Sequence, residues 1–268
     1  MRVRLAKTFV DRHPLAFSSL LTLALFGLAI ASMAAIPRAT ISTVEDLPPG
    51  LELPPSDLER ALITTVSPEN LFHILGILLA ICLLTWLGWW RGAGFNRLSQ
   101  WRNLRLLSFP FLVGALPLLG GIRFSGPAFL ASMLLSTLIA AFSEEVLYRG
   151  VVWRALLPTG LIRAAVETSL LSGVLRFGTS AMAGPWPEAL LLMIPTICVS
   201  FMYAALRWRT ASIWPVIPIH FVLTFTTSIS TPRTIQYLVP LLVFFGTLGF
   251  VGYGLFLLRN PRVRADGG

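Results

Sequence analysis

The sequence contains little charge for its length. Only 12% of its 268 residues are Asp, Glu, Lys or Arg, whereas 55% are hydrophobic, and the mean hydropathy is +0.77. Soluble globular domains carry roughly 25% charged residues, so this chain has too few to cover a surface that faces water. The composition therefore excludes a soluble enzyme, a disordered chain and most nucleic-acid-binding proteins.

Cysteine and lysine are also scarce. The two cysteines, Cys82 and Cys198, both lie inside apolar runs, which leaves neither a disulfide framework nor a cysteine metal site. Lys7 is the only lysine among 21 basic residues, an arginine bias that favours a GC-rich bacterial source. These basic residues lie between apolar runs and form no single patch, so we expect no nucleic-acid partner.

Long apolar runs recur along the whole chain. Because about 20 helical residues cross the hydrocarbon core of a bilayer, we expect an all-α polytopic transmembrane helix bundle of about eight spans, forming one membrane domain over residues 1–268. The third run contains Pro110 and Pro117, which predicts a bend or a partial crossing. The first run is too long for a cleaved signal peptide, and Pro37 follows it, so we expect a retained anchor. The runs are 15–36, 71–90, 106–120, 128–148, 164–181, 189–206, 211–229 and 235–258.

The basic residues predict the orientation of this bundle. Sixteen of the 21 fall in the two termini and in alternate loops, on one side of the bundle. The positive-inside rule then places both termini in the cytoplasm. Together with the bacterial source, this predicts a protein of the bacterial inner membrane. Segment 37–70, on the opposite side, is acidic and rich in proline, and we expect an extended, non-cytoplasmic connecting loop there.

Three charged residues stand at the end of the fourth apolar run. Glu145 and Arg149 are four residues apart and share a helix face, so we expect them to form a structural ion pair. Glu144 is rotated by about 100° from Glu145 and lacks that partner, which leaves it free to hold a water molecule or to accept its proton. A group of charges extending from a helix end to the interface is the alternative interpretation.

The pattern Glu144-Glu145-x-x-x-Arg149 at the end of a membrane helix resembles the first motif of the CAAX-processing and bacteriocin-processing family of glutamic intramembrane proteases. Residues 214–224 fit a further motif of that family, with His220 on the motif histidine and Thr224 where the family has asparagine or aspartate.

Residues 169–176 fit the family's Ser-x-x-Phe-Gly-x-x-His frame with two departures. Serine stands at the phenylalanine position, and Arg176 stands at the histidine position. An arginine inside a span is costly without a carboxylate nearby, so we expect Arg176 to lie beside Glu144 and to pair with it.

The resemblance implies a catalytic core over residues 106–229 and a metal-independent endopeptidase without cofactors. Glu144 would activate water for attack on a peptide bond, and His220 and Arg176 would supply donors to the oxyanion. Thr224, with one donor, would take the supporting place of an amide. The expected partners are the lipid bilayer and a membrane-anchored peptide or protein substrate.

Other interpretations stay open at this point. The two departures permit an inactive member that binds or scaffolds a membrane partner, or a bacteriocin-immunity protein. A transporter would require matched broken helices in two repeats, which the sequence lacks. A metal site is disfavoured, because Glu144 and His220 are too few ligands for a closed zinc site. Arg163 and Glu167 are spaced for a surface ion pair, and His73 is expected at a solvated helix end.

Overall fold

The computed structural model describes residues 2–36, 56–96, 101–122, 126–230 and 239–259. Its elements are helices joined by turns, and the all-α membrane bundle expected from the sequence is confirmed. The helices are α1 (Arg2–Arg12), α2 (Pro14–Ala35), α4 (Asp57–Thr65), α5 (Pro68–Leu87), α6 (Ser108–Ala115), α7 (Pro127–Glu145), α8 (Trp153–Leu156), α9 (Leu161–Ala183), α10 (Trp186–Thr210), α11 (Val216–Ile229) and α12 (Val239–Arg259), with 3-10 segments η1 (Trp101–Leu107), η2 (Leu116–Gly120) and η4 (Leu157–Thr159) and a π-helical turn η3 (Val146–Val152).

Every apolar run of the sequence corresponds to helical structure. Four stretches of the described chain are long and apolar enough to cross a membrane, and shorter apolar helices accompany them. Large apolar side chains such as Leu23, Leu191 and Phe245 point outward with at least 65% of their surface exposed, as a lipid-facing surface requires. The long stretches are Pro14–Ala35, Ala61–Leu87, Pro127–Thr159 and Trp186–Thr210. The count of eight spans and the cytoplasmic side of the termini stay predictions.

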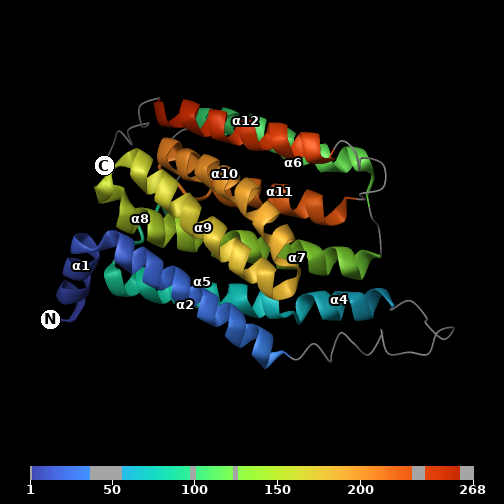
Figure 1. Ribbon diagram of the computed structural model, residues 1–268, viewed down its shortest axis with the longest axis horizontal. Helices are drawn as coiled ribbons and strands as arrows, with labels where there is room; N and C mark the ends of the chain where they lie inside the picture. The colour runs from blue at the N-terminus through green and yellow to red at the C-terminus, as the bar shows by residue number, and fades with distance from the viewer. Residues whose placement is uncertain (1, 37–55, 97–100, 123–125, 231–238, 260–268) are drawn as a thin grey trace.

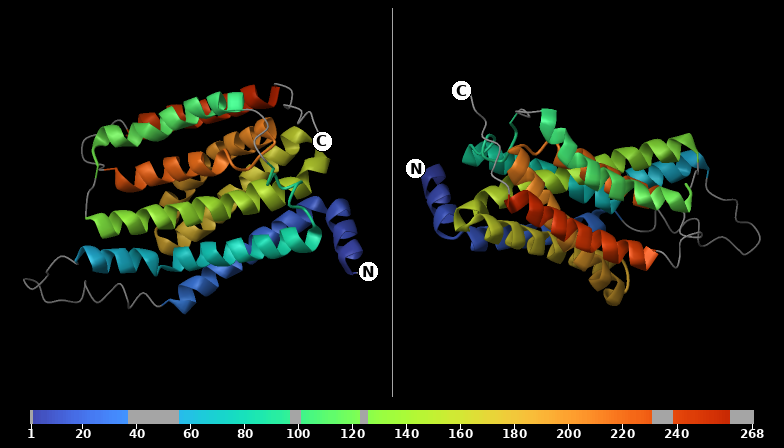
Figure 2. Two further views of the ribbon diagram at one scale, coloured as in Figure 1. Left: turned by 180° about the vertical axis from the view of Figure 1, so that it is seen from behind. Right: turned by 90° about the horizontal axis from the view of Figure 1, so that it is seen from above.

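The helices lie roughly side by side along one direction (Figure 1). From one edge to the other, α6 and α12 are followed by α10 and α11, then by α7 and α9, and finally by α2, α4 and α5. In both views of Figure 2, α1 and the last turn of α12 lie at the same end of the bundle. The residues that carry the first motif lie in the interior of this stack.

The third apolar run is broken, as its prolines predict. It consists of η1, the short helix α6 and η2, and α6 ends at Ala115 just before Pro117. The seventh run starts later than expected, at Val216, because Ala211 adopts a left-handed conformation (φ 56°) that ends α10.

Segment 37–70 differs from the expected extended loop in its second half. Residues 57–65 form α4, while residues 37–55 lie outside the described part of the chain. The Asp57 carboxylate accepts hydrogen bonds from the backbone N–H groups of Ala128 and Phe129, at 2.9 and 2.8 Å, and so caps the first turn of α7. The prediction of an extended loop was therefore wrong for residues 57–65, where one of the acidic residues caps a neighbouring helix.

Glycines allow close approach between the interior helices. A Cβ added to Gly254 of α12 would lie 2.7 Å from Cδ1 of Phe201 on α10. Gly249 of the same helix faces the Phe109 ring of α6 at 3.0 Å, whereas Gly252 has open space around it. Small residues at such contacts let membrane helices gain van der Waals packing, and the glycines of the last span serve this purpose at two of these three positions.

Gly254→Leu is expected to destabilise the bundle by about 1–3 kcal/mol through overpacking against Phe201. Gly252→Leu, two residues away on an open face, is the matched control and gains the same helix propensity. The measurement is the thermal unfolding midpoint in detergent, which should fall only for Gly254→Leu. Equal midpoints for the two variants would contradict the packing described for α10 and α12.

Candidate active site

The residues of the first motif belong to one uninterrupted helical run. This run, Pro127–Thr159, consists of α7, the π-helical turn η3 and the short segments that follow. The π turn starts immediately after Glu145, and all seven of its residues are buried. Such turns are rare and frequently accompany functional sites. The run carries charged side chains into the core, where η3 packs against α5, α9 and α10.

The expected ion pair between Glu145 and Arg149 is present. Arg149 Nε lies 3.3 Å from Glu145 Oε2, and the two side chains are 1% and 0% exposed. The Arg149 guanidinium also donates to Ser200 of α10, at 3.0 Å to the carbonyl oxygen and 2.5 Å to Oγ. A buried charge pair is stable only when its remaining hydrogen-bonding capacity is used, and Ser200 uses part of that capacity.

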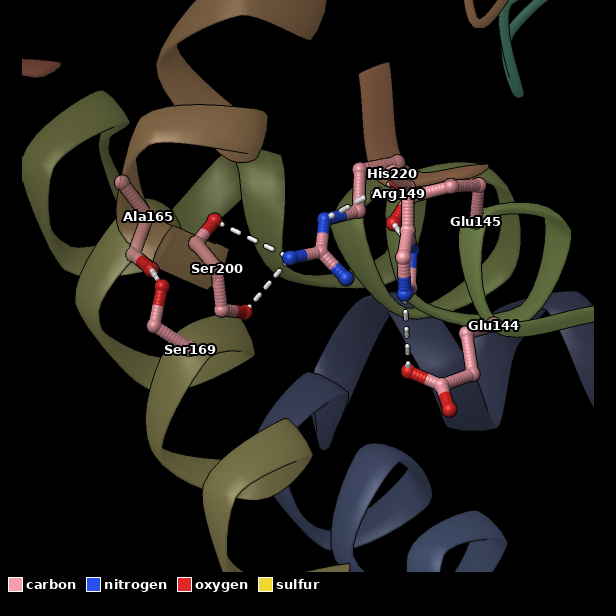
Figure 3. A network of polar contacts seen from close by, with 7 residues as sticks. All are labelled: Glu144, Glu145, Arg149, Ala165, Ser169, Ser200 and His220. Atoms are coloured by element: carbon pink, nitrogen blue, oxygen red, sulfur yellow. Dashed lines mark hydrogen bonds and ion pairs between the residues drawn. The ribbon is translucent and has the colours of Figure 1, made fainter. Parts of the chain in front are cut away.

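His220 of α11 lies between the two glutamates (Figure 3). Its Nδ1 is 2.7 Å from Glu145 Oε1, and its Nε2 is 3.8 Å from Glu144 Oε2. The Tyr203 ring stacks on the imidazole, with 5.1 Å between the ring centroids. The Arg149 guanidinium lies 5.2 Å from the centroid of the same Tyr203 ring. The hydrogen bond at Nδ1 therefore fixes the ring so that Nε2 points toward Glu144.

Glu144 has a more open environment than its neighbour. Its side chain is 26% exposed, whereas that of Glu145 is fully buried. The separation of 3.8 Å from His220 Nε2 exceeds a hydrogen bond, yet one water molecule can bond to both groups at that separation. The two adjacent glutamates thus differ in surroundings: Glu145 is enclosed by an ion pair and a histidine, and Glu144 faces free space.

That space is a cavity of about 300 Å³ between α2, α5, α7 and α9. Arg176 lines it together with Glu144, so the structure brings these two predicted residues to one site. No ion pair joins them within the described residues, and in this respect the expected Glu144–Arg176 pair is not formed. Arg176 is exposed, and the cavity is therefore open to the surface beside this residue of α9.

His73 lines the same cavity, and the expectation of a solvated helix end was wrong for it. It stands on α5, and its Nδ1 is buried. No motif pointed to this residue. The available signal was its spacing, because Glu69, Asn70 and His73 lie three or four residues apart on one face of an apolar helix.

No described hydrogen bond joins the Thr224 side chain to Glu144, Glu145, Arg149 or His220. Among its described interactions, only its backbone carbonyl takes part, accepting from the hydroxyls of Thr227 and Ser228. The described residues contain no group of three or more His, Cys, Asp and Glu side chains placed to hold a metal ion. The predicted surface ion pair is confirmed, with Arg163 Nε 2.7 Å from Glu167 Oε1.

Arg149→Met is expected to cost about 3–5 kcal/mol of stability, because it removes one partner of a buried pair and leaves the Glu145 charge unbalanced. Arg163→Met breaks a pair of the same spacing whose arginine is 60% exposed, and it should cost less than about 1 kcal/mol. Thermal unfolding in detergent compares the two variants. A similar shift for both would contradict a structural role of the buried pair.

Comparison with known proteins agrees with the motifs. No curated protein and no solved structure matched the chain. A protein-family model described as Type II CAAX prenyl endopeptidase Rce1-like matches residues 125–226, a segment that includes all of α7 and most of α11, the helix of His220. The expected resemblance to the CAAX-processing proteases is thus confirmed over residues 125–226.

Proposed function

We propose that this protein is an intramembrane endopeptidase in which Glu144 activates water for hydrolysis of a peptide bond. The Rce1-like match supports a CAAX-type protease of the membrane. One observation carries the finer proposal: Glu144 lies at an open cavity, 3.8 Å from a histidine that Glu145 holds in orientation. Hydrolysis needs an acid–base group, a partner that positions the water and a space for the substrate, and Glu144, His220 and the cavity can serve as these three parts.

The reaction follows from the positions of these groups. Water bound between Glu144 and His220 Nε2 gives a proton to Glu144 as its oxygen attacks the peptide carbonyl carbon. The carbonyl oxygen becomes negative, and the permanent charge of Arg176 stabilises it from the cavity wall. Glu144 then returns the proton to the peptide nitrogen, the C–N bond breaks, and the products are a carboxylate and an amine.

The cavity also indicates the class of substrate. It opens to the surface beside Arg176 of α9, and the same helix carries exposed apolar side chains at Leu170 and Val174. A volume of about 300 Å³ is at the lower end of ligand pockets and accommodates a few residues of an extended peptide. A membrane-anchored peptide can enter from the bilayer side, and a prenylated peptide ending in a CAAX sequence (cysteine, two aliphatic residues and any residue) is the probe that the family description suggests.

A non-catalytic binding protein is the second candidate. The arginine at position 176 and the threonine at position 224, both departures from the family pattern, are the observations that favour it. Such a protein would retain the probe peptide without cleaving it. Cleavage by the purified chain distinguishes the two functions.

Glu144→Gln is expected to lower kcat for a fluorogenic farnesylated CAAX peptide by about 10²–10⁴-fold, because the amide cannot accept the proton of water. Glu188→Gln, at the exposed start of α10, is the matched control and should retain wild-type turnover. The assay uses the full-length chain in phosphatidylcholine vesicles, with products identified by mass spectrometry. Unchanged cleavage by Glu144→Gln would refute the mechanism.

A further inference from the structure

The cavity contains an imidazole that the proposed reaction has not used. His73 of α5 lines it together with Glu144 of α7 and Arg176 of α9, so ionisable side chains of three helices meet there, and Glu69 of α5 and Tyr148 of η3 line it as well. His220 is not among the residues that line this cavity, although its Nε2 lies 3.8 Å from Oε2 of Glu144, which does line it. A peptide in the cavity would therefore meet His73 directly.

No hydrogen bond is described for the His73 side chain. Its Nδ1 is buried and makes no hydrogen bond, and its ring contacts the neighbouring Phe72 at 4.9 Å between centroids. A buried polar group without a partner costs about 1–3 kcal/mol. Unpaired polar groups of this kind are rare in native proteins. A ligand in the cavity cannot reach the buried Nδ1, so Nε2, which is not among the buried unpaired atoms, is the ring nitrogen left to bond to one.

The helix that carries His73 is fixed against α7 on both sides of this residue. One turn before it, Asn70 donates to the carbonyls of Thr64 and Thr65 and to Ser136 Oγ of α7, at 2.9, 3.0 and 2.7 Å. One turn after it, a Cβ on Gly76 would lie 2.8 Å from Ser143 Oγ, next to Glu144. His73 is thus held in register with Glu144, as groups that act in a transition state must be.

We propose that His73 is a catalytic residue that donates an imidazole N–H to the developing oxyanion of the peptide in this cavity. Two donors, His73 and Arg176, would then face the carbonyl oxygen from α5 and α9, while His220 orients the water on the other side of Glu144. The imidazole missing from position 176 is supplied by another helix. This inference rests on the proposed function.

The test compares His73→Ala with the exchange variant His73→Ala/Arg176→His in the vesicle assay with the farnesylated peptide. His73→Ala should lower kcat by about 10²–10³-fold, the effect of removing one oxyanion donor, and should change KM much less. The exchange variant returns an imidazole to the cavity from α9 and should recover at least about tenfold of the lost kcat. His13→Ala removes an exposed histidine at the start of α2 and should leave turnover unchanged.

The outcomes separate this inference from the proposed function. If the wild-type chain cleaves, Glu144→Gln does not, and His73→Ala retains wild-type kcat, the role of His73 is refuted and the mechanism stands. A loss in His73→Ala that the exchange variant does not restore, with a lowered unfolding midpoint, assigns His73 a structural role and also refutes the proposal. If the wild-type chain cleaves no peptide, farnesylated or unmodified, both proposals fail.

Discussion

The buried carboxylate of Glu145 is the interaction on which the site depends. One of its oxygens pairs with Arg149, and the other bonds to Nδ1 of His220. These contacts join α7, the π turn and α11, and Ser200 extends the network to α10. A fully buried charge is tolerated only with such partners. The network therefore fixes three helices and, at the same time, the direction in which the His220 ring points.

The same network accounts for the different surroundings of two adjacent glutamates. Glu145 has used both oxygens inside the bundle, whereas Glu144, one residue earlier, faces the cavity. Under the proposed function, Glu145 and its partners hold the helices in place, and Glu144 at the cavity takes part in the reaction. Under this proposal the membrane contributes as well, because large apolar side chains are exposed on the outside of the helices and a substrate held in the bilayer can approach the cavity from there.

The sequence predicted what depends on local spacing and failed where distant segments meet. The apolar runs predicted the helices, and the spacing of four residues predicted the Glu145–Arg149 pair. The hydrogen bond from Glu145 to His220 joins residues 75 positions apart, and no local pattern encodes it. His73 was missed for the same reason: the register of α5 against α7, set by Asn70, decides what it faces.

Chemical rescue tests the central claim most directly. Removing the Glu144 side chain by substitution with alanine abolishes the base and leaves room for a small carboxylate in a cavity of about 300 Å³. Added formate should restore peptide cleavage by Glu144→Ala in proportion to its concentration, because it can accept the proton of water in place of the side chain. A Glu144→Ala variant that cleaves at the wild-type rate, or that formate does not reactivate, would contradict the account.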